Sequence, residues 1–234
     1  MQTAQGIEKG DVLQRLAGAS FIVGALMLIV LGILHPQADD RSDLAGVIEK
    51  NAETNGGLWQ VEHQLLAVGF CALMIGAVGV YRSISTGTAA VFARLGFYGV
   101  IVGTALLTVL WAFDGVGLAV VADLWEDAAA ADKGTMLLVA TAMDGFLNGI
   151  RSLAFTAFWL ALVFLGIGIA MGAVHPRWLG WVIIVLGAVG AVFSFAFGLI
   201  TELSDALVLV FVVVSMLTYL WALAMGVWIS RKAW

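Results

Sequence analysis

The sequence predicts an all-α fold, a polytopic membrane helix bundle with six transmembrane helices in one domain, residues 1–234. The first reason is composition: 62% of the residues are hydrophobic and 12% are charged, with a mean hydropathy of +1.03. In soluble domains roughly half of the residues are apolar and roughly a quarter are charged. The second is length, because several apolar runs reach the roughly 20 residues that cross a hydrocarbon core about 30 Å thick. The third is a biased placement of basic residues between successive loops.

Polar residues bound the first two spans. The first span, at about 16–34, ends at His35. Its apolar run is longer than that of a cleavable signal, so we expect it to remain in the protein. The segment 37–58 that follows is rich in Asp, Glu, Asn and Gly, and three of its aliphatic residues repeat at helical spacing. This pattern indicates a short amphipathic helix on the membrane surface, followed by a second span at about 59–81.

The next two helices are too long for the bilayer. The third span, at about 91–114, begins a run that stays apolar well beyond its end. The chain is then compatible with helix from Thr135 to Ala173, which is about 58 Å at 1.5 Å per residue and about twice the membrane thickness. Residues 152–173 suffice for the fourth span. We therefore expect the third and fourth helices to extend beyond the outer face, where 37–58 and 115–150 form an outer cap. The alternative is that 115–150 folds over the surface as a lid.

Basic residues give the orientation. The last two spans, at about 178–200 and 206–229, lack charge, and six spans place both termini on one side. Fourteen of the sixteen acidic residues fall on the opposite side. Because basic loops stay inside, we expect cytoplasmic N- and C-termini and a multi-pass protein of the plasma (inner) membrane. The basic residues on the terminal side are Lys9, Arg15, Arg82, Arg94, Arg177, Arg231 and Lys232, against Arg41, Lys50, Lys133 and Arg151 on the other.

Tryptophan and glycine patterns agree with this plan. Trp59 and Trp111 fall near outer span ends, where aromatic residues typically line the interface. Gly99 and Gly103 have the spacing that lets two helices approach closely. This pattern predicts a tightly packed bundle and does not establish a dimer.

Three short segments carry a family resemblance. The turn at His175–Trp181 (H-P-R-W-L-G-W) lies between two apolar spans. It resembles the P-R-x-L-G turn between spans four and five in small bacterial six-span membrane proteins of unknown function. The segments Trp111–Gly115 (W-A-F-D-G) and Trp59–His63 (W-x-x-x-H) are similar to pieces of related actinobacterial-type proteins. The resemblance implies the six-span fold and no particular activity.

The residues that could carry chemistry gather at the outer ends of the spans. An ionisable group at mid-bilayer costs at least about 2.5–3.5 kcal/mol unless it is paired or hydrated, so such groups tend to face the bundle interior. Asp144 and Arg151 are too far apart on one helix to pair readily, so we expect each to find partners on other helices, with Glu62 or Asp114 for Arg151. The alternative is that these groups are ordinary loop charges, interfacial anchors or a helix kink. The candidate ligand-binding residues are Glu62, His63, Asp114, Asp144, Asn148 and Arg151, with Thr141 on the same helix face.

A metal site is the sharpest enzymatic hypothesis. His35, His63 and Asp114 would make a three-ligand site for zinc or another divalent metal, with an open position for water, as a metal-dependent membrane hydrolase requires. No H-E-x-x-H pair supports it. His175 lies on the opposite side and cannot contribute.

Three functions follow from these patterns. The first is a non-enzymatic membrane protein with an outer-leaflet polar pocket that binds a small ligand or cation. The second is an accessory or structural subunit of a larger membrane complex or homo-oligomer, in which the polar groups only connect helices. The third is the metal-dependent hydrolase; otherwise no cofactor is expected. The lipid bilayer is the expected partner, and the acidic net charge of −5 argues against nucleic acid.

Overall fold

Almost all of the described chain is helical. Six of its helices are long and apolar enough to cross a membrane, and no strand occurs in the part of the chain that the structure describes. This confirms the predicted all-α, six-span fold of an integral, multi-pass membrane protein. The computed structural model describes residues 4–35, 46, 48, 57–199 and 205–233.

In the described parts of the chain, eight helical segments form the six spans. The third span is one continuous rod, in which a single π-helical turn, η1, joins the α-helices α4 and α5. The α6–α7 turn ends at Pro176, the N-cap residue that directly precedes Arg177, the first residue of α7. The segments are α1 (Ala4–Leu34), α3 (Gly57–Ser83), α4 (Gly87–Ala112), η1 (Phe113–Gly117), α5 (Leu118–Asp127), α6 (Lys133–Met171), α7 (Arg177–Phe197) and α8 (Asp205–Ala233).

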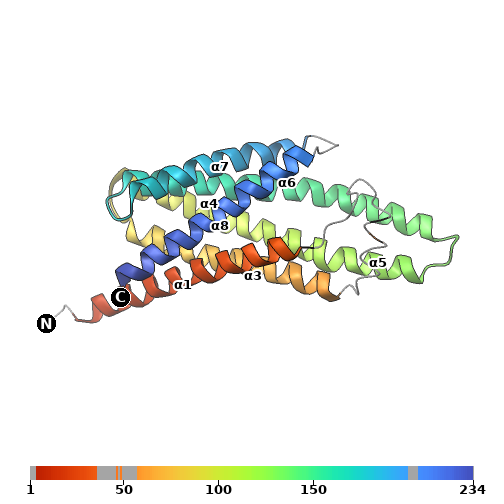
Figure 1. The fold of residues 1–234 in the computed structure, drawn as a ribbon, viewed down its shortest axis with the longest axis horizontal. Coiled ribbons are helices and arrows are strands. Elements are labelled where there is room, and N and C mark those ends of the chain that lie inside the picture. The colour runs from red at the N-terminus through yellow and green to blue at the C-terminus, as the bar shows by residue number, and fades with distance from the viewer. Residues whose placement is uncertain (1–3, 36–45, 47, 49–56, 200–204, 234) are drawn as a thin grey trace.

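The six spans form a closed ring. Helix α1 packs against α3, α3 against α4, α4 against α6, α6 against α7 and α7 against α8, and α8 packs back against α1. The start of α1 and the end of α8 lie at the same end of the bundle (Figure 1). We call the end opposite to them the outer end, in keeping with the orientation expected from the basic residues.

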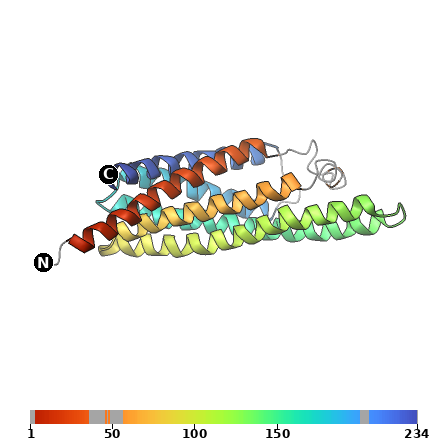
Figure 2. The ribbon, with the colours of Figure 1, turned by 90° about the horizontal axis from the view of Figure 1, so that it is seen from below.

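Two helices project past the others at the outer end. Helix α6 has 39 residues, about 58 Å of helix, and its first turns pair with α5 in a hairpin that extends beyond α1, α3, α7 and α8 (Figure 2). Most of the cap segment 37–58 lies outside the described residues. Ile48 is described: it is buried against Val121 and Ala122 of α5 and Ala140 of α6. The helix continues past residue 114 through the π-helical turn, in keeping with the expectation that the third helix extends beyond its membrane span.

Aromatic side chains fill the middle of the ring. The Phe70 ring lies 5.3 Å from Phe158 and 6.3 Å from Tyr219, while Phe21 meets Trp221 at 6.1 Å. On the α4–α6 seam, Gly103 lets α4 approach so closely that an added Cβ would lie 2.7 Å from the Phe158 backbone. The bundle is therefore densely packed below its outer end.

Candidate functional site

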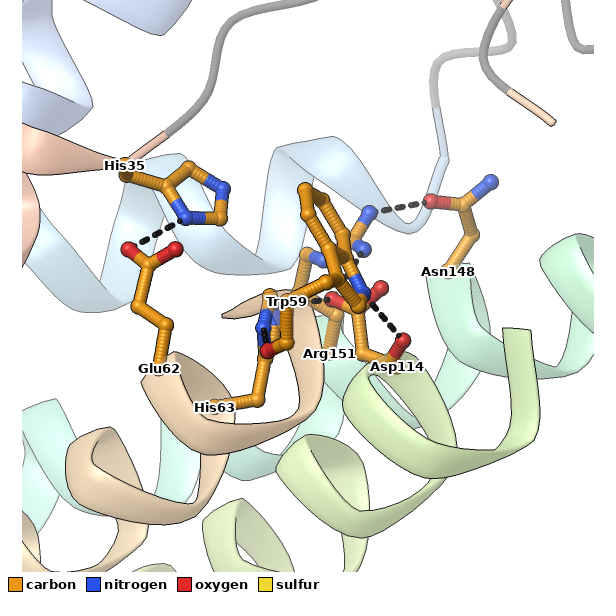
Figure 3. Close-up of polar contacts among 7 residues, drawn as sticks. All are labelled: His35, Trp59, Glu62, His63, Asp114, Asn148 and Arg151. Atoms are coloured by element: carbon orange, nitrogen blue, oxygen red, sulfur yellow. Dashed lines mark hydrogen bonds and ion pairs between the residues drawn. The ribbon is translucent and has the colours of Figure 1, made fainter. Parts of the chain in front are cut away.

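The outer polar cluster forms where parts of four helical elements meet. The end of α1, the first turns of α3, the π-helix η1 and the middle of α6 all contribute side chains (Figure 3). The sequence analysis named five of these residues as ligand-binding candidates and a sixth, His35, as a metal ligand. The cluster consists of His35, Trp59, Glu62, His63, Asp114, Asn148 and Arg151.

Helix α3 supplies three members from one face. Trp59, Glu62 and His63 lie at i, i+3 and i+4, so their side chains share one side of the first turns. Nδ1 of His63 lies 2.8 Å from the backbone carbonyl oxygen of Trp59, and the two rings are in tilted contact with centroids 4.4 Å apart. His63 is fully buried, with 0% of its surface exposed. The Trp59 ring therefore covers His63 and helps exclude water from it.

The π-helix places Asp114 opposite His63. A π-helical turn contains one extra residue, and such turns are frequent at functional sites. The carbonyl oxygen of Asp114 accepts a 2.7 Å hydrogen bond from the indole nitrogen of Trp59. Gly115 allows the two helices to come together, because a Cβ at this position would lie 2.5 Å from Cβ of His63. The sequence left open whether Asp114-Gly115 is a kink or a site, and the structure combines the π-helical turn with a buried carboxyl group.

The Asp114 carboxylate lies between a cation and a histidine. Its Oδ2 atom is 3.4 Å from Nη2 of Arg151 and 3.7 Å from Nε2 of His63. The first contact is one of the two pairings expected for Arg151. Asp114 is buried, whereas Arg151 reaches the surface with 33% of its side chain exposed. Arg151 therefore connects the buried carboxylate with solvent.

A chain of polar contacts continues from Arg151 along α6. Nη1 of Arg151 donates to Oδ1 of Asn148 at 2.8 Å, and Nδ2 of Asn148 donates to Oδ2 of Asp144 at 3.0 Å. The expectation that Asp144 pairs with another helix is therefore wrong for this contact, because its partner lies one turn away on α6. Thr141 is exposed and donates to the carbonyl of Leu137, so it does not join the cluster.

Glu62 forms the other edge of the cluster with His35. Oε1 of Glu62 lies 2.9 Å from Nδ1 of His35, and the His35 ring contacts both Trp59 and His63 at centroid distances of 5.2 and 5.3 Å. This edge joins the end of α1 to α3. Glu62, the second partner expected for Arg151, is thus engaged with His35 instead.

Nε2 of His63 is a buried polar atom without a hydrogen-bond partner. Beneath it lies Trp111, whose ring centroid is 5.5 Å from that of His63, and Trp111 packs in turn on Phe70 and Phe155. Buried polar atoms are usually hydrogen-bonded, so each exception calls for an explanation. The unpartnered atom faces Oδ2 of Asp114 at 3.7 Å, so a hydrogen-bond donor or a positive charge would satisfy it.

The metal-ligand set expected from the sequence does not assemble. Within the described residues, no group of three His, Cys, Asp or Glu side chains is placed to hold a metal ion. His35 contacts Glu62, while Asp114 contacts Arg151 and approaches only His63. The three residues thus lie in one cluster without converging on a common point.

His175 lies at the inner end, apart from the cluster, as the sequence predicted. Its Nε2 atom is 2.7 Å from Oγ of Ser83, so it joins the α6–α7 turn to the end of α3. Burial lowers the pKa of His175 to about 4, and the charge of nearby Lys232 acts in the same direction. The sequence analysis gave Ser83 no role, and no signal in the sequence links two residues so far apart.

A scan against protein-family models, a search of curated proteins and a search of solved structures each find no match to this chain. The resemblance to small bacterial six-span proteins remains a prediction. The sequence carries no sign of the role of Gly115, and it placed Trp59 at the membrane interface and in the W-x-x-x-H segment without a contact to Asp114. The signal available for Trp59 was its position four residues before His63, which places both on one helix face.

Proposed function

We propose that this protein resides in the plasma membrane with both termini in the cytoplasm, and that it binds a small cation at the outer polar cluster without catalysing a reaction. The observation that carries this proposal is the buried Nε2 atom of His63, which lacks a partner and lies 3.7 Å from the Asp114 carboxylate. A bound cation or hydrogen-bond donor would satisfy both atoms.

Charge supports a cation as the ligand. The cluster and its extension along α6 contain the carboxylates of Glu62, Asp114 and Asp144 and only one permanent cation, Arg151. Fourteen of the sixteen acidic residues belong to the side expected to face outward. A surface of one sign raises the local concentration of counter-ions.

The interior supports binding without passage across the membrane. The floor of the cluster is Trp111, and below it Phe70, Phe155, Phe158 and Tyr219 pack ring against ring. Transporters usually place broken helices and charges near the membrane midplane. Here the π-helical break lies beside the outer cluster and above this aromatic layer.

The test is a ligand panel on the full chain in lipid nanodiscs. Thermal unfolding is measured with monovalent, divalent and small organic cations and over a range of pH. We expect one of these cations, the proton included, to raise the melting temperature of the native chain and not that of Asp114→Asn. The matched control is Asp123→Asn, an equal charge change at an exposed position of α5, which should keep the full response.

A specific observation also favours the second function, a structural or accessory role. The contacts from Asp144 through Asn148, Arg151 and Asp114 toward His63 form a nearly continuous chain that ties α6 to η1 and α3. If this is the only role, His63→Ala and Asp114→Asn destabilise the bundle equally in every condition, and no cation shifts the melting temperature. That result would replace the binding proposal with the structural one.

A further inference from the structure

The hydrogen bond at Nδ1 fixes the protonation pattern of the His63 ring. A backbone carbonyl can only accept a hydrogen bond, so the 2.8 Å contact with the carbonyl of Trp59 requires a proton on Nδ1. In the neutral imidazole, Nε2 is then a lone pair. The structure thus places the acceptor side of His63 toward Oδ2 of Asp114 at 3.7 Å.

Two acceptors that face each other in a buried site repel. Nε2 of His63 is buried and without a partner, and only 10% of the Asp114 side chain is exposed. A single proton removes the conflict, because it turns one acceptor into a donor whether it resides on Nε2 or on Oδ2. We infer that the cation bound by the outer polar cluster is a proton, shared between Nε2 of His63 and Oδ2 of Asp114. This inference rests on the proposed function and names its ligand.

The proton comes from bulk water at the edge of the cluster where Arg151 is exposed. On binding, an N–H or O–H bond forms in the pair while one O–H bond of a hydronium ion breaks and leaves water, so the charge of the site rises by one. Charge-assisted hydrogen bonds are shorter than the present 3.7 Å separation, at about 2.7–2.9 Å. We therefore expect the distance between the His63 ring and the Asp114 carboxylate to become shorter when the proton binds.

The same atom of Asp114 also holds Arg151. Oδ2 lies 3.4 Å from Nη2 of Arg151, so a proton on either member of the pair weakens this contact. Arg151 keeps its 2.8 Å hydrogen bond to Asn148 on α6. Proton binding therefore loosens the tie between α6 and η1, at the base of the projecting α5–α6 hairpin.

Among the described residues, three further ionisable groups lie close to the His63–Asp114 pair and affect how strongly it binds a proton. His35, directly after the end of α1, lies against the His63 ring and opposes added positive charge, whereas Glu62 of α3 favours it. Arg151 of α6 favours an ionised Asp114. The shared proton therefore belongs to the cluster as a unit, and its affinity depends on all these neighbours.

The test is nitrogen NMR of the full chain labelled with ¹⁵N-histidine, in nanodiscs, between about pH 5 and pH 8. The chain has three histidines, and His63→Gln identifies the His63 signals. We expect Nδ1 of His63 to stay protonated throughout, while Nε2 changes from a free lone pair to a proton-sharing state as the pH falls. In Asp114→Asn the Nε2 signal should stay that of a lone pair, and in the exposed control Asp123→Asn it should behave as in the native chain.

The outcomes separate this inference from the proposed function. If the Nε2 signal of the native chain stays that of an unprotonated nitrogen at every pH, but a metal or organic cation shifts it, the ligand is not a proton. The proposal of a cation-binding site then still stands. If neither a change of pH nor any other cation shifts the Nε2 signal, both the shared proton and the cation-binding function are refuted. A pH response that is identical in Asp114→Asn overturns the sharing with Asp114. If Asp114→Asn does not fold, the native titration still decides whether Nε2 takes up a proton.

Discussion

The indole nitrogen of Trp59 donates a 2.7 Å hydrogen bond to the backbone carbonyl of Asp114. The two residues are 55 positions apart, and this contact fixes the first turns of α3 against the π-helical turn of the third span. Trp59 also accepts from Nδ1 of His63 through its own carbonyl. One tryptophan thus sets both the tautomer of His63 and the position of the carboxylate that faces it.

Trp59→Phe should weaken the cluster while keeping an aromatic ring against His63. It removes the donor to a π-helix carbonyl, and the loss of a hydrogen bond to a buried acceptor costs about 1–3 kcal/mol. Equilibrium unfolding in mixed micelles measures the change. Trp178→Phe is the control, since the Trp178 side chain is mostly exposed and its replacement should be nearly neutral. Equal effects of the two changes would argue against the hydrogen bond.

Gly115→Ala should disrupt the contact between η1 and α3. The new Cβ would lie 2.5 Å from Cβ of His63, and overpacking of this kind costs about 1–3 kcal/mol. Gly145→Ala on α6 is the matched control, because a Cβ there meets open space and alanine favours a helix by up to about 1 kcal/mol. Opposite signs of the two free-energy changes are expected. A neutral Gly115→Ala would contradict the close packing of His63.

Arg151→Leu should destabilise the native chain more than it destabilises an Asp114→Asn background. Removing the cation leaves the buried carboxylate uncompensated, which costs about 1–3 kcal/mol at this partly exposed pair. A double-mutant cycle measures the coupling between the two residues. Strictly additive changes would show that the 3.4 Å contact contributes no interaction energy.

Acidification should destabilise the inner turn through His175. Its pKa is about 4 in the folded chain and 6.5 without burial, so unfolded chains bind more protons between these values. The contribution of His175 to stability is therefore constant above pH 6.5 and falls as the pH drops toward 4, by up to roughly 3 kcal/mol. His175→Gln should remove this part of the pH dependence in unfolding experiments. An unchanged acid slope in that variant would contradict the burial of a neutral His175.

The fold could be predicted from the sequence because bilayer physics leaves few choices. Apolar length gave six spans, and the excess length of the fourth helix required it to project from the membrane. The continuation of the third helix past Asp114 was expected, but not the form it takes: a π-helical turn carries the buried carboxyl group without ending the helix.

The candidate site could be predicted in its residues and only partly in its contacts. Asp114 with Arg151 was one of two expected pairs, since buried charges of opposite sign attract. The pairing of His35 with Glu62, and of Asp144 with Asn148 on its own helix, depends on side-chain rotamers that composition and spacing do not determine. The role of Gly115 depends on the distance between two helices, which sequence does not give.

Counting protons tests the central claim most directly. Potentiometric titration of the full chain between about pH 5 and pH 8 compares the native protein with His63→Gln, with Asp114→Asn and with the double variant. Because one proton belongs to the pair, each single variant and the double variant should bind about one proton fewer than the native chain. Two results would contradict the shared proton. One is that Asp114→Asn binds as many protons as the native chain, and the other is that the double variant binds two protons fewer than the native chain.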